Sequence, residues 1–238
     1  MRLAGTTTSS SDRRSGMVSI LSAIHPELPV NTASYWIVTL PFVTIPDKSN
    51  GYEEIASLFI SRRGQNVSGV GASVVADWSE ILPGGARVLD LGCGTGVPIT
   101  QTLIERGFDV YGVDASASMI AAFRARFPTI PVECAAVEDS NFFGRTFEGV
   151  VAWGLFFLLD AEDQRRLMAK VAAVLPSGGR LLFTAPSQSC SWTDAMTERI
   201  SISLGHEVYR NALEAEGMLL VGTHRDEGEN HYYFALKT

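Results

Sequence analysis

From residue 86 onward the sequence alternates short apolar runs with longer segments of helical spacing, and this rhythm constrains the fold more than any other feature. Short turns join the segments, and Ser116 and Asp160 stand where helix N-caps are expected. Strands that alternate with helices predict a parallel sheet covered by helices on both faces. The predicted strands cover 86–91, 108–113, 131–135, 147–153 and 180–185.

The end of the chain has a different rhythm. A helix over 207–216 ends at Gly217, and two strands over 218–225 and 231–237 follow it. The segment between these strands is too short for a parallel crossover connection. The two strands are therefore predicted to pair antiparallel as a hairpin.

The beginning of the chain differs from the rest. Residues 1–50 contain a run of Thr and Ser and several prolines, which predict a flexible or loosely docked extension. Residues 51–238 are predicted to form the folded domain, opened by helices over 53–63 and 68–82. The apolar segment after Arg13 and Arg14 is too short for an export signal.

Composition narrows the function classes. The chain has 19 Lys and Arg against 26 Asp and Glu, a net charge of −7, which disfavours a nucleic-acid partner. No apolar run reaches the roughly 20 residues that cross a bilayer. Cys93, Cys134 and Cys190 are widely spaced and predict no metal site. We expect a cytoplasmic monomer or homodimer that binds neither membrane nor nucleic acid.

A glycine-rich loop follows the first strand of the alternating region. Gly92, Gly94 and Gly96 precede a helix, so bare backbone and free N–H groups can approach a ligand. Asp114 ends the second strand, 22 residues after Gly92, where a carboxylate can bind ribose hydroxyls. These features fit a nucleotide-dependent oxidoreductase nearly as well as other nucleoside-binding proteins.

Two details favour a different ligand. The spacing is G-x-G-x-G rather than the G-x-G-x-x-G of dinucleotide-binding loops. Asp90 stands two residues before Gly92, where it suits an ammonium group better than a pyrophosphate. Ribose at Asp114, ammonium near Asp90 and a carboxylate at the helix start together indicate S-adenosylmethionine.

The segments 90–96 and 113–116 closely resemble motifs I and II of the class I S-adenosylmethionine-dependent methyltransferases. The resemblance runs from about Tyr52 to the end of the chain. It implies a Rossmann-like, doubly wound α/β fold with a seven-stranded sheet of order 3-2-1-4-5-7-6 and strand 7 antiparallel. It also implies methyl transfer to an O, N or S atom of a small molecule, with a non-catalytic cofactor-binding subunit as an alternative.

The resemblance implies the cofactor-binding residues. Tyr52 would cover the cofactor, Met119 would pack on the adenine, and Trp153 would line the methionine arm; each is equally compatible with core packing. Cys93 is expected to be a small loop residue rather than a nucleophile. The frequent Gly-Asp-Ala after strand 3 is Ala135-Ala136-Val137 here, which leaves Glu138 or Asp139 for the adenine amine. The implied set is Asp90, Gly92, Cys93, Gly94, Gly96, Asp114, Ala115, Met119, Val137, Glu138, Asp139, Trp153 and Tyr52.

No catalytic constellation stands out, which agrees with a reaction whose methyl donor is already activated. The acceptor pocket is expected from the N-terminal helices, the segment 188–194 and the final hairpin. Asp194 and His231 are weak candidates for a general base. The alternatives are that 188–194 is only a polar connection and that His231 only begins a strand.

Overall fold

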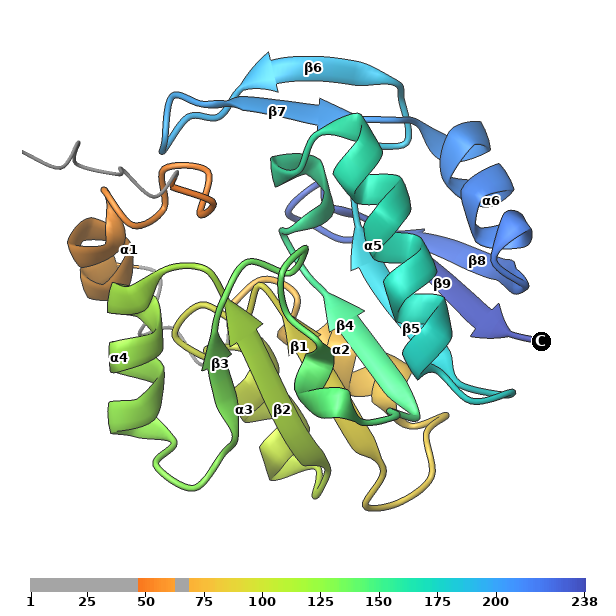
Figure 1. The fold of residues 1–238 in the computed structure, drawn as a ribbon, viewed down its shortest axis with the longest axis horizontal. Coiled ribbons are helices and arrows are strands. Elements are labelled where there is room, and N and C mark those ends of the chain that lie inside the picture. The colour runs from red at the N-terminus through yellow and green to blue at the C-terminus, as the bar shows by residue number, and fades with distance from the viewer. Residues whose placement is uncertain (1–46, 63–68) are drawn as a thin grey trace, which may run out of the picture. The chain divides into compact units, whose positions relative to one another are not determined.

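Seven strands form one twisted sheet in the computed structural model, which describes residues 47–62 and 69–238 (Figure 1). The strands are β1 Arg87–Leu91, β2 Asp109–Asp114, β3 Val132–Cys134, β4 Gly149–Ala152, β5 Arg180–Thr184, β8 Met218–Arg225 and β9 His231–Lys237. Their order is β3-β2-β1-β4-β5-β9-β8. The pairs from β3 to β5 are parallel, whereas β9 runs antiparallel to both β5 and β8. The predicted order and the antiparallel hairpin are confirmed.

Helices cover both faces of this sheet because alternate residues of each central strand point to opposite sides. Val88 of β1 packs with α2 and α3, whereas its neighbour Leu89 packs in the cluster that contains α5 and α6. The α4 helix packs beside the loop after β1, through Ile120 and Phe123. The helices are α1 Ala56–Arg62, α2 Ala72–Ser79, α3 Ile99–Glu105, α4 Ala117–Arg126, α5 Ala161–Val174 and α6 His206–Ala215.

Local capping sets two of the helix starts as predicted. The hydroxyl of Ser116 accepts the backbone N–H of Met119 at the start of α4. The carboxylate of Asp160 accepts the N–H groups of Glu162 and Asp163 at the start of α5. The helices α1 and α2 are shorter than the predicted 53–63 and 68–82, and residues 63–68 lie outside the described residues. The predicted extension also lies outside them, apart from residues 47–50.

A second, two-stranded sheet was not predicted. Strands β6 Cys190–Thr193 and β7 Ile200–Ser203 pair antiparallel between β5 and α6. Half-buried Trp192 is the sole large apolar residue of β6, so the sequence there lacks the apolar run that marks a strand. In Figure 1 this hairpin lies apart from the main sheet, beyond the C-terminal end of β5.

Candidate functional site

A pocket of about 770 Å³ opens at the carboxyl ends of β1, β2 and β4. This is the edge at which open α/β sheets bind ligands, and the volume suits a small molecule. One part, here called the loop end, is lined by Asp90, Gly92–Gly94, Asp114–Ala115 and Met119. The other part, here called the hairpin end, is lined by Leu155, Phe157–Leu159 and Trp192–Met196.

The glycine loop needs its glycines for two different reasons. Gly92, Gly94 and Gly96 all have positive φ angles, of 71°, 53° and 81°, which other residues adopt with strain. Gly92 and Gly94 line the pocket, so their bare backbone faces a ligand. Gly96 does not line it; a Cβ there would lie 2.5 Å from the Phe127 ring and 2.9 Å from the Phe123 ring. Gly96 therefore lets α4 pack against the loop.

Asp114 links the glycine loop to the start of α4. One carboxylate oxygen accepts the N–H of Gly94 at 2.9 Å, and the other accepts the N–H of Ser116 at 2.8 Å. Burial raises the pKa of Asp114 above its ordinary value, and these two hydrogen bonds offset part of that rise. Each oxygen keeps a lone pair for a further donor, and Asp114 remains half-buried at the pocket wall.

Asp90 is the most unusual charge in the pocket. It is 1% exposed, and the structure gives it one side-chain donor, the hydroxyl of Thr100 at 2.6 Å. Burial, assisted by the charge of Asp114, raises the pKa of Asp90 to about 7. The described residues place no basic side chain in an ion pair with it. A buried carboxylate without a cationic partner is costly, so a cationic ligand group would be favoured here.

Cys93 and Met119 are both packed into the protein. A Cβ on Gly112 of β2 would lie 2.9 Å from the Cys93 sulfur, which shows how closely the thiol packs on that strand. Burial raises the pKa of Cys93 well above its ordinary value, so the thiol stays protonated and is no nucleophile. Met119 is 2% exposed yet lines the pocket, so it is part of both the core and the wall.

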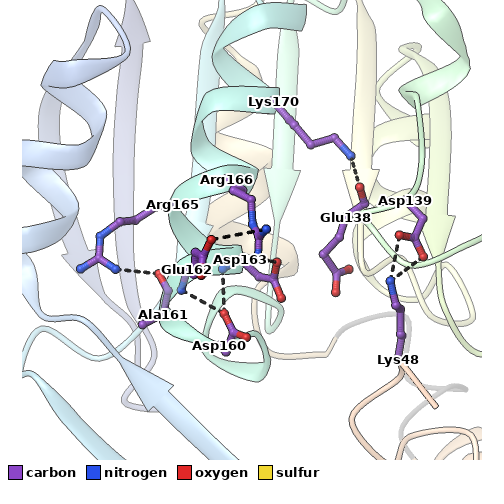
Figure 2. A network of polar contacts seen from close by, with 10 residues as sticks. All are labelled: Lys48, Glu138, Asp139, Asp160, Ala161, Glu162, Asp163, Arg165, Arg166 and Lys170. Carbon is purple, nitrogen blue, oxygen red and sulfur yellow. Dashed lines mark hydrogen bonds and ion pairs between the residues drawn. The ribbon is translucent and has the colours of Figure 1, made fainter. Parts of the chain in front are cut away.

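The segment after β3 is held in place by Lys170 of α5. The Lys170 ammonium donates to the carbonyl oxygens of Val137, Glu138 and Ser140 at 2.6–2.8 Å. The Asp139 carboxylate accepts hydrogen bonds from the Lys48 ammonium at 2.7 and 2.8 Å (Figure 2). Glu138 keeps one buried carboxylate oxygen without a partner. Val137, Glu138 and Asp139 are not among the residues that line the pocket.

Sequence reasoning missed the segment before α1. Lys48, Ser49 and Asn50 line the pocket beside Tyr52, which was predicted. Glu53 binds the start of α4, because its carboxylate accepts the hydroxyls of Ser116 and Ser118 and the Ser118 N–H. These hydrogen bonds lower the pKa of Glu53. The signal in the sequence was only a glutamate near the domain start, which specifies no partner.

Trp153 at the end of β4 is fixed from two sides. Its indole N–H donates to the Tyr232 hydroxyl at 3.0 Å, and Tyr232 donates to Asp226 at 2.7 Å. A Cβ on Gly71 would lie 2.6 Å from the indole nitrogen. Burial and the Asp226 carboxylate raise the pKa of Tyr232 far above its usual range, so the hydroxyl remains a donor. Trp153 lines the pocket with its polar atom already satisfied.

The two weak candidates for a base lie in different places. Asp194 lines the pocket, but its Oδ1 accepts the backbone N–H groups of Met196 and Thr197 and so builds the β6–β7 turn. His231 is not among the lining residues; its ring packs on Tyr233 with 4.8 Å between centroids. Burial lowers the pKa of His231, and the charges of His206 and Arg225 lower it further.

Residues 47–62 and 69–238 contain no group of three or more His, Cys, Asp or Glu side chains arranged to hold a metal ion. Over the same ranges, every helix is too short or too polar to span a bilayer.

Comparison with known proteins first gives a family match that includes the residues of the loop end. Residues 88–179 match a family described as a methyltransferase domain. An uncharacterized methyltransferase of Mycobacterium tuberculosis is 31% identical over 158 residues, covering 65% of this chain and 62% of that protein. Aklanonic acid methyltransferase of Streptomyces sp. is 29% identical over 147 residues, covering 58% and 61%. The chain thus spans about 62% of the length of the first of these relatives.

Solved structures support the fold. An amino pentose methyltransferase from Micromonospora echinaspora has a TM-score of 0.60 at 21% identity, over 77% of this chain and 97% of that one. A Burkholderia thailandensis N1-methyltransferase, solved with S-adenosylhomocysteine, has a TM-score of 0.61 at 20% identity, over 77% and 87%. A [4+2]-cyclase has a TM-score of 0.63 at 15% identity, over 80% and 96%. The same fold thus occurs with different named activities.

Proposed function

We propose that this chain is a class I S-adenosylmethionine-dependent methyltransferase that methylates a small molecule, because residues 88–179 match a methyltransferase domain and similar proteins are methyltransferases. Two similar proteins support a small-molecule acceptor. The name of one includes aklanonic acid, and the other was solved with bound 1,6-didemethyltoxoflavin. The single observation that carries the proposal is buried Asp90 beside the glycine loop. An unpaired carboxylate at that point fits the ammonium group of an amino-acid arm.

Different residues at the loop end would bind different parts of the cofactor. Asp114 would accept hydrogen bonds from the two ribose hydroxyls through its remaining lone pairs. Asp90 would face the ammonium group, and the bare backbone of Gly92 and Gly94 would allow close approach. Met119 would contact the adenine. When bound, S-adenosylmethionine supplies a methyl group activated by its positively charged sulfur.

Two acidic residues are candidate acceptors for the adenine amine, and their hydrogen-bond partners differ. Lys48 binds the Asp139 carboxylate, whereas Glu138 has a buried oxygen without a partner. A buried acceptor without a donor is unfavourable, and an exocyclic amine would satisfy it. We therefore assign the amine contact to Glu138.

Methyl transfer depends more on how the acceptor is positioned than on acid–base catalysis. The acceptor's lone pair forms the new bond to the methyl carbon, and the carbon–sulfur bond breaks with its electron pair going to sulfur. A neutral acceptor then releases its proton to water. The chain's own contribution is to hold the acceptor beside Trp153 and to exclude water with the apolar hairpin end. The acceptor atom, O, N or S, follows from whichever group is held there.

Calorimetric titration of the full chain with S-adenosylhomocysteine tests this proposal. Asp114→Ala should weaken binding by about 1.5–3 kcal/mol, the scale of hydrogen bonds to a charged group. Asp109→Ala is the matched control, because it removes an exposed aspartate from the other end of β2 and should leave affinity unchanged. Binding of NADPH in place of S-adenosylhomocysteine would favour an oxidoreductase. Tight binding without turnover of any acceptor would favour a non-catalytic subunit.

A further inference from the structure

The hairpin end of the pocket is made almost entirely of apolar side chains. Leu155 and Phe157–Leu159 follow β4, and they include the short 3-10 helix η2 Phe156–Leu158. Trp192 faces them from β6. In the sheet order β2-β1-β4-β5, these residues lie beyond β4, on the side away from Asp114. They therefore form the wall that an acceptor would meet.

Two aromatic rings define the shape of this wall. The rings of Phe157 and Trp192 have centroids 5.5 Å apart and planes inclined by 47°. Both side chains are half-buried, as are Leu155, Leu158 and Leu159. Apolar groups that keep water contact inside one concave surface are typical of a ligand site rather than of a core.

Several polar groups near this wall are already engaged by the protein. The Trp153 N–H is bound to Tyr232. Asp226 accepts from Tyr232 and Asn230, and Asp194 binds its own turn through Oδ1. A polar acceptor such as a sugar would lose hydrogen bonds to water and find few replacements among these groups. A flat apolar acceptor would lose little.

We propose that the acceptor is a planar aromatic compound whose ring lies against Phe157 and Trp192. Aromatic rings pair favourably with such rings in tilted or offset geometries. The nucleophilic atom on the ring would then point toward Trp153 and the loop end. This inference rests on the proposed methyl transfer, because it identifies the compound that receives the methyl group.

The test uses 2-naphthol as a planar probe and decahydro-2-naphthol as its saturated, non-planar counterpart. Each is titrated by calorimetry into the full chain saturated with S-adenosylhomocysteine. We expect 2-naphthol to bind about tenfold more tightly than the saturated alcohol, because only the flat ring can pair with both side chains. Equal affinities, or no binding of 2-naphthol to the loaded protein, would overturn the proposal.

Variants locate the probe. Trp192→Ala should weaken 2-naphthol binding about tenfold, whereas Trp192→Phe should retain most of it. Ile200→Ala is the control, since this 58% exposed side chain belongs to the same hairpin but not to the pocket. If Trp192→Ala fails to fold, Phe157→Leu removes the second ring while keeping apolar volume. Unchanged 2-naphthol affinity in the folded variants would overturn the proposal.

The outcomes of the two titrations separate methyl transfer from the class of acceptor. If S-adenosylhomocysteine does not bind the wild-type protein, the proposed methyl transfer is wrong and the acceptor inference falls with it. If it binds normally while 2-naphthol behaves like its saturated counterpart, methyl transfer stands and only the aromatic acceptor is rejected.

Discussion

The loop end and the hairpin end of the pocket are built in opposite ways. The loop end comes from one short stretch of chain, in which the adjacent strands β1 and β2 carry Asp90 and Asp114 at their carboxyl ends, around the glycine loop. The hairpin end combines residues that follow β4, including those of η2, with residues of β6 and the β6–β7 turn. Arg199 of the β6–β7 turn pairs with Glu54 at 2.8 Å, across 145 residues of sequence. Local chemistry thus specifies the first region, and long-range packing specifies the second.

Gly96→Ala should produce the largest effect, because a positive φ angle and close packing both exclude a side chain at this position of the glycine loop. A positive φ and a clash with two phenylalanine rings together should cost about 2–5 kcal/mol of unfolding free energy. Gly84→Ala is the matched control, because a Cβ there meets nothing within 4 Å. Urea unfolding measures both. Similar losses in the two variants would remove the packing argument for Gly96.

Asp90 gives the loop end a pH dependence of unusual sign. Its pKa is about 7 in the folded protein against an ordinary value of 3.8, so the folded state holds a proton that the unfolded chain has released. This contribution to stability is complete below about pH 4 and is lost as pH rises to about 7. Asp90→Asn removes the carboxylate and therefore the loss.

Urea unfolding of the wild type and of Asp90→Asn at pH 5 and pH 8 measures this effect. The stability of the variant relative to the wild type should rise by about 1–4 kcal/mol between the two pH values. The same variant should bind S-adenosylhomocysteine more weakly at pH 8, because the ammonium group loses its partner. A relative stability that does not change with pH would contradict the unpaired state of Asp90.

At the hairpin end, the Asp194 carboxylate has two candidate roles. It builds the β6–β7 turn, and it lines the pocket as a candidate base. Asp194→Ala should cost about 1–2 kcal/mol of stability, the value of a lost side-chain cap, whereas asparagine keeps the oxygen that accepts the turn N–H groups. If Asp194→Asn restores stability and methylates 2-naphthol at the wild-type rate, Asp194 only builds the turn. A large fall in kcat with unchanged stability would make it a base.

The smallest effects concern the segment after β3. Lys48→Ala breaks an exposed ion pair with Asp139 and should change the affinity for S-adenosylhomocysteine by less than about 1 kcal/mol. Glu138→Gln should weaken binding by about 1 kcal/mol or more, whereas Asp139→Asn should not. Calorimetry at one salt concentration compares the three. A stronger effect at Asp139 would reverse the assignment of the adenine amine.

The predicted sheet followed from signals that are local in the sequence. Apolar runs marked the central strands, caps marked α4 and α5, and the short segment 226–230 required an antiparallel pair. Asp90, Asp114 and the glycines were identified because their spacing along the chain is itself the geometry of the loop end. The structure brings these residues to one pocket wall, apart from Gly96, which packs against α4.

The hairpin end could not be predicted in the same way. Trp192 lies in a mostly polar strand, so no apolar period marked β6. Glu53 acts through serines more than 60 residues away, and Trp153 is held through Tyr232 from the other end of the domain. His231 was a weak candidate for a base, but it pairs with Arg225 of β8 and is not among the residues that line the pocket. Such pairings depend on the assembled fold.

The position of the β6–β7 hairpin has a consequence for how this chain can diversify. The hairpin lies between β5 and α6 in the chain, and its two strands pair with each other rather than with the main sheet. Exchange of the hairpin would replace Trp192 and its neighbours in the pocket wall and leave Asp90, Asp114 and the glycine loop in place.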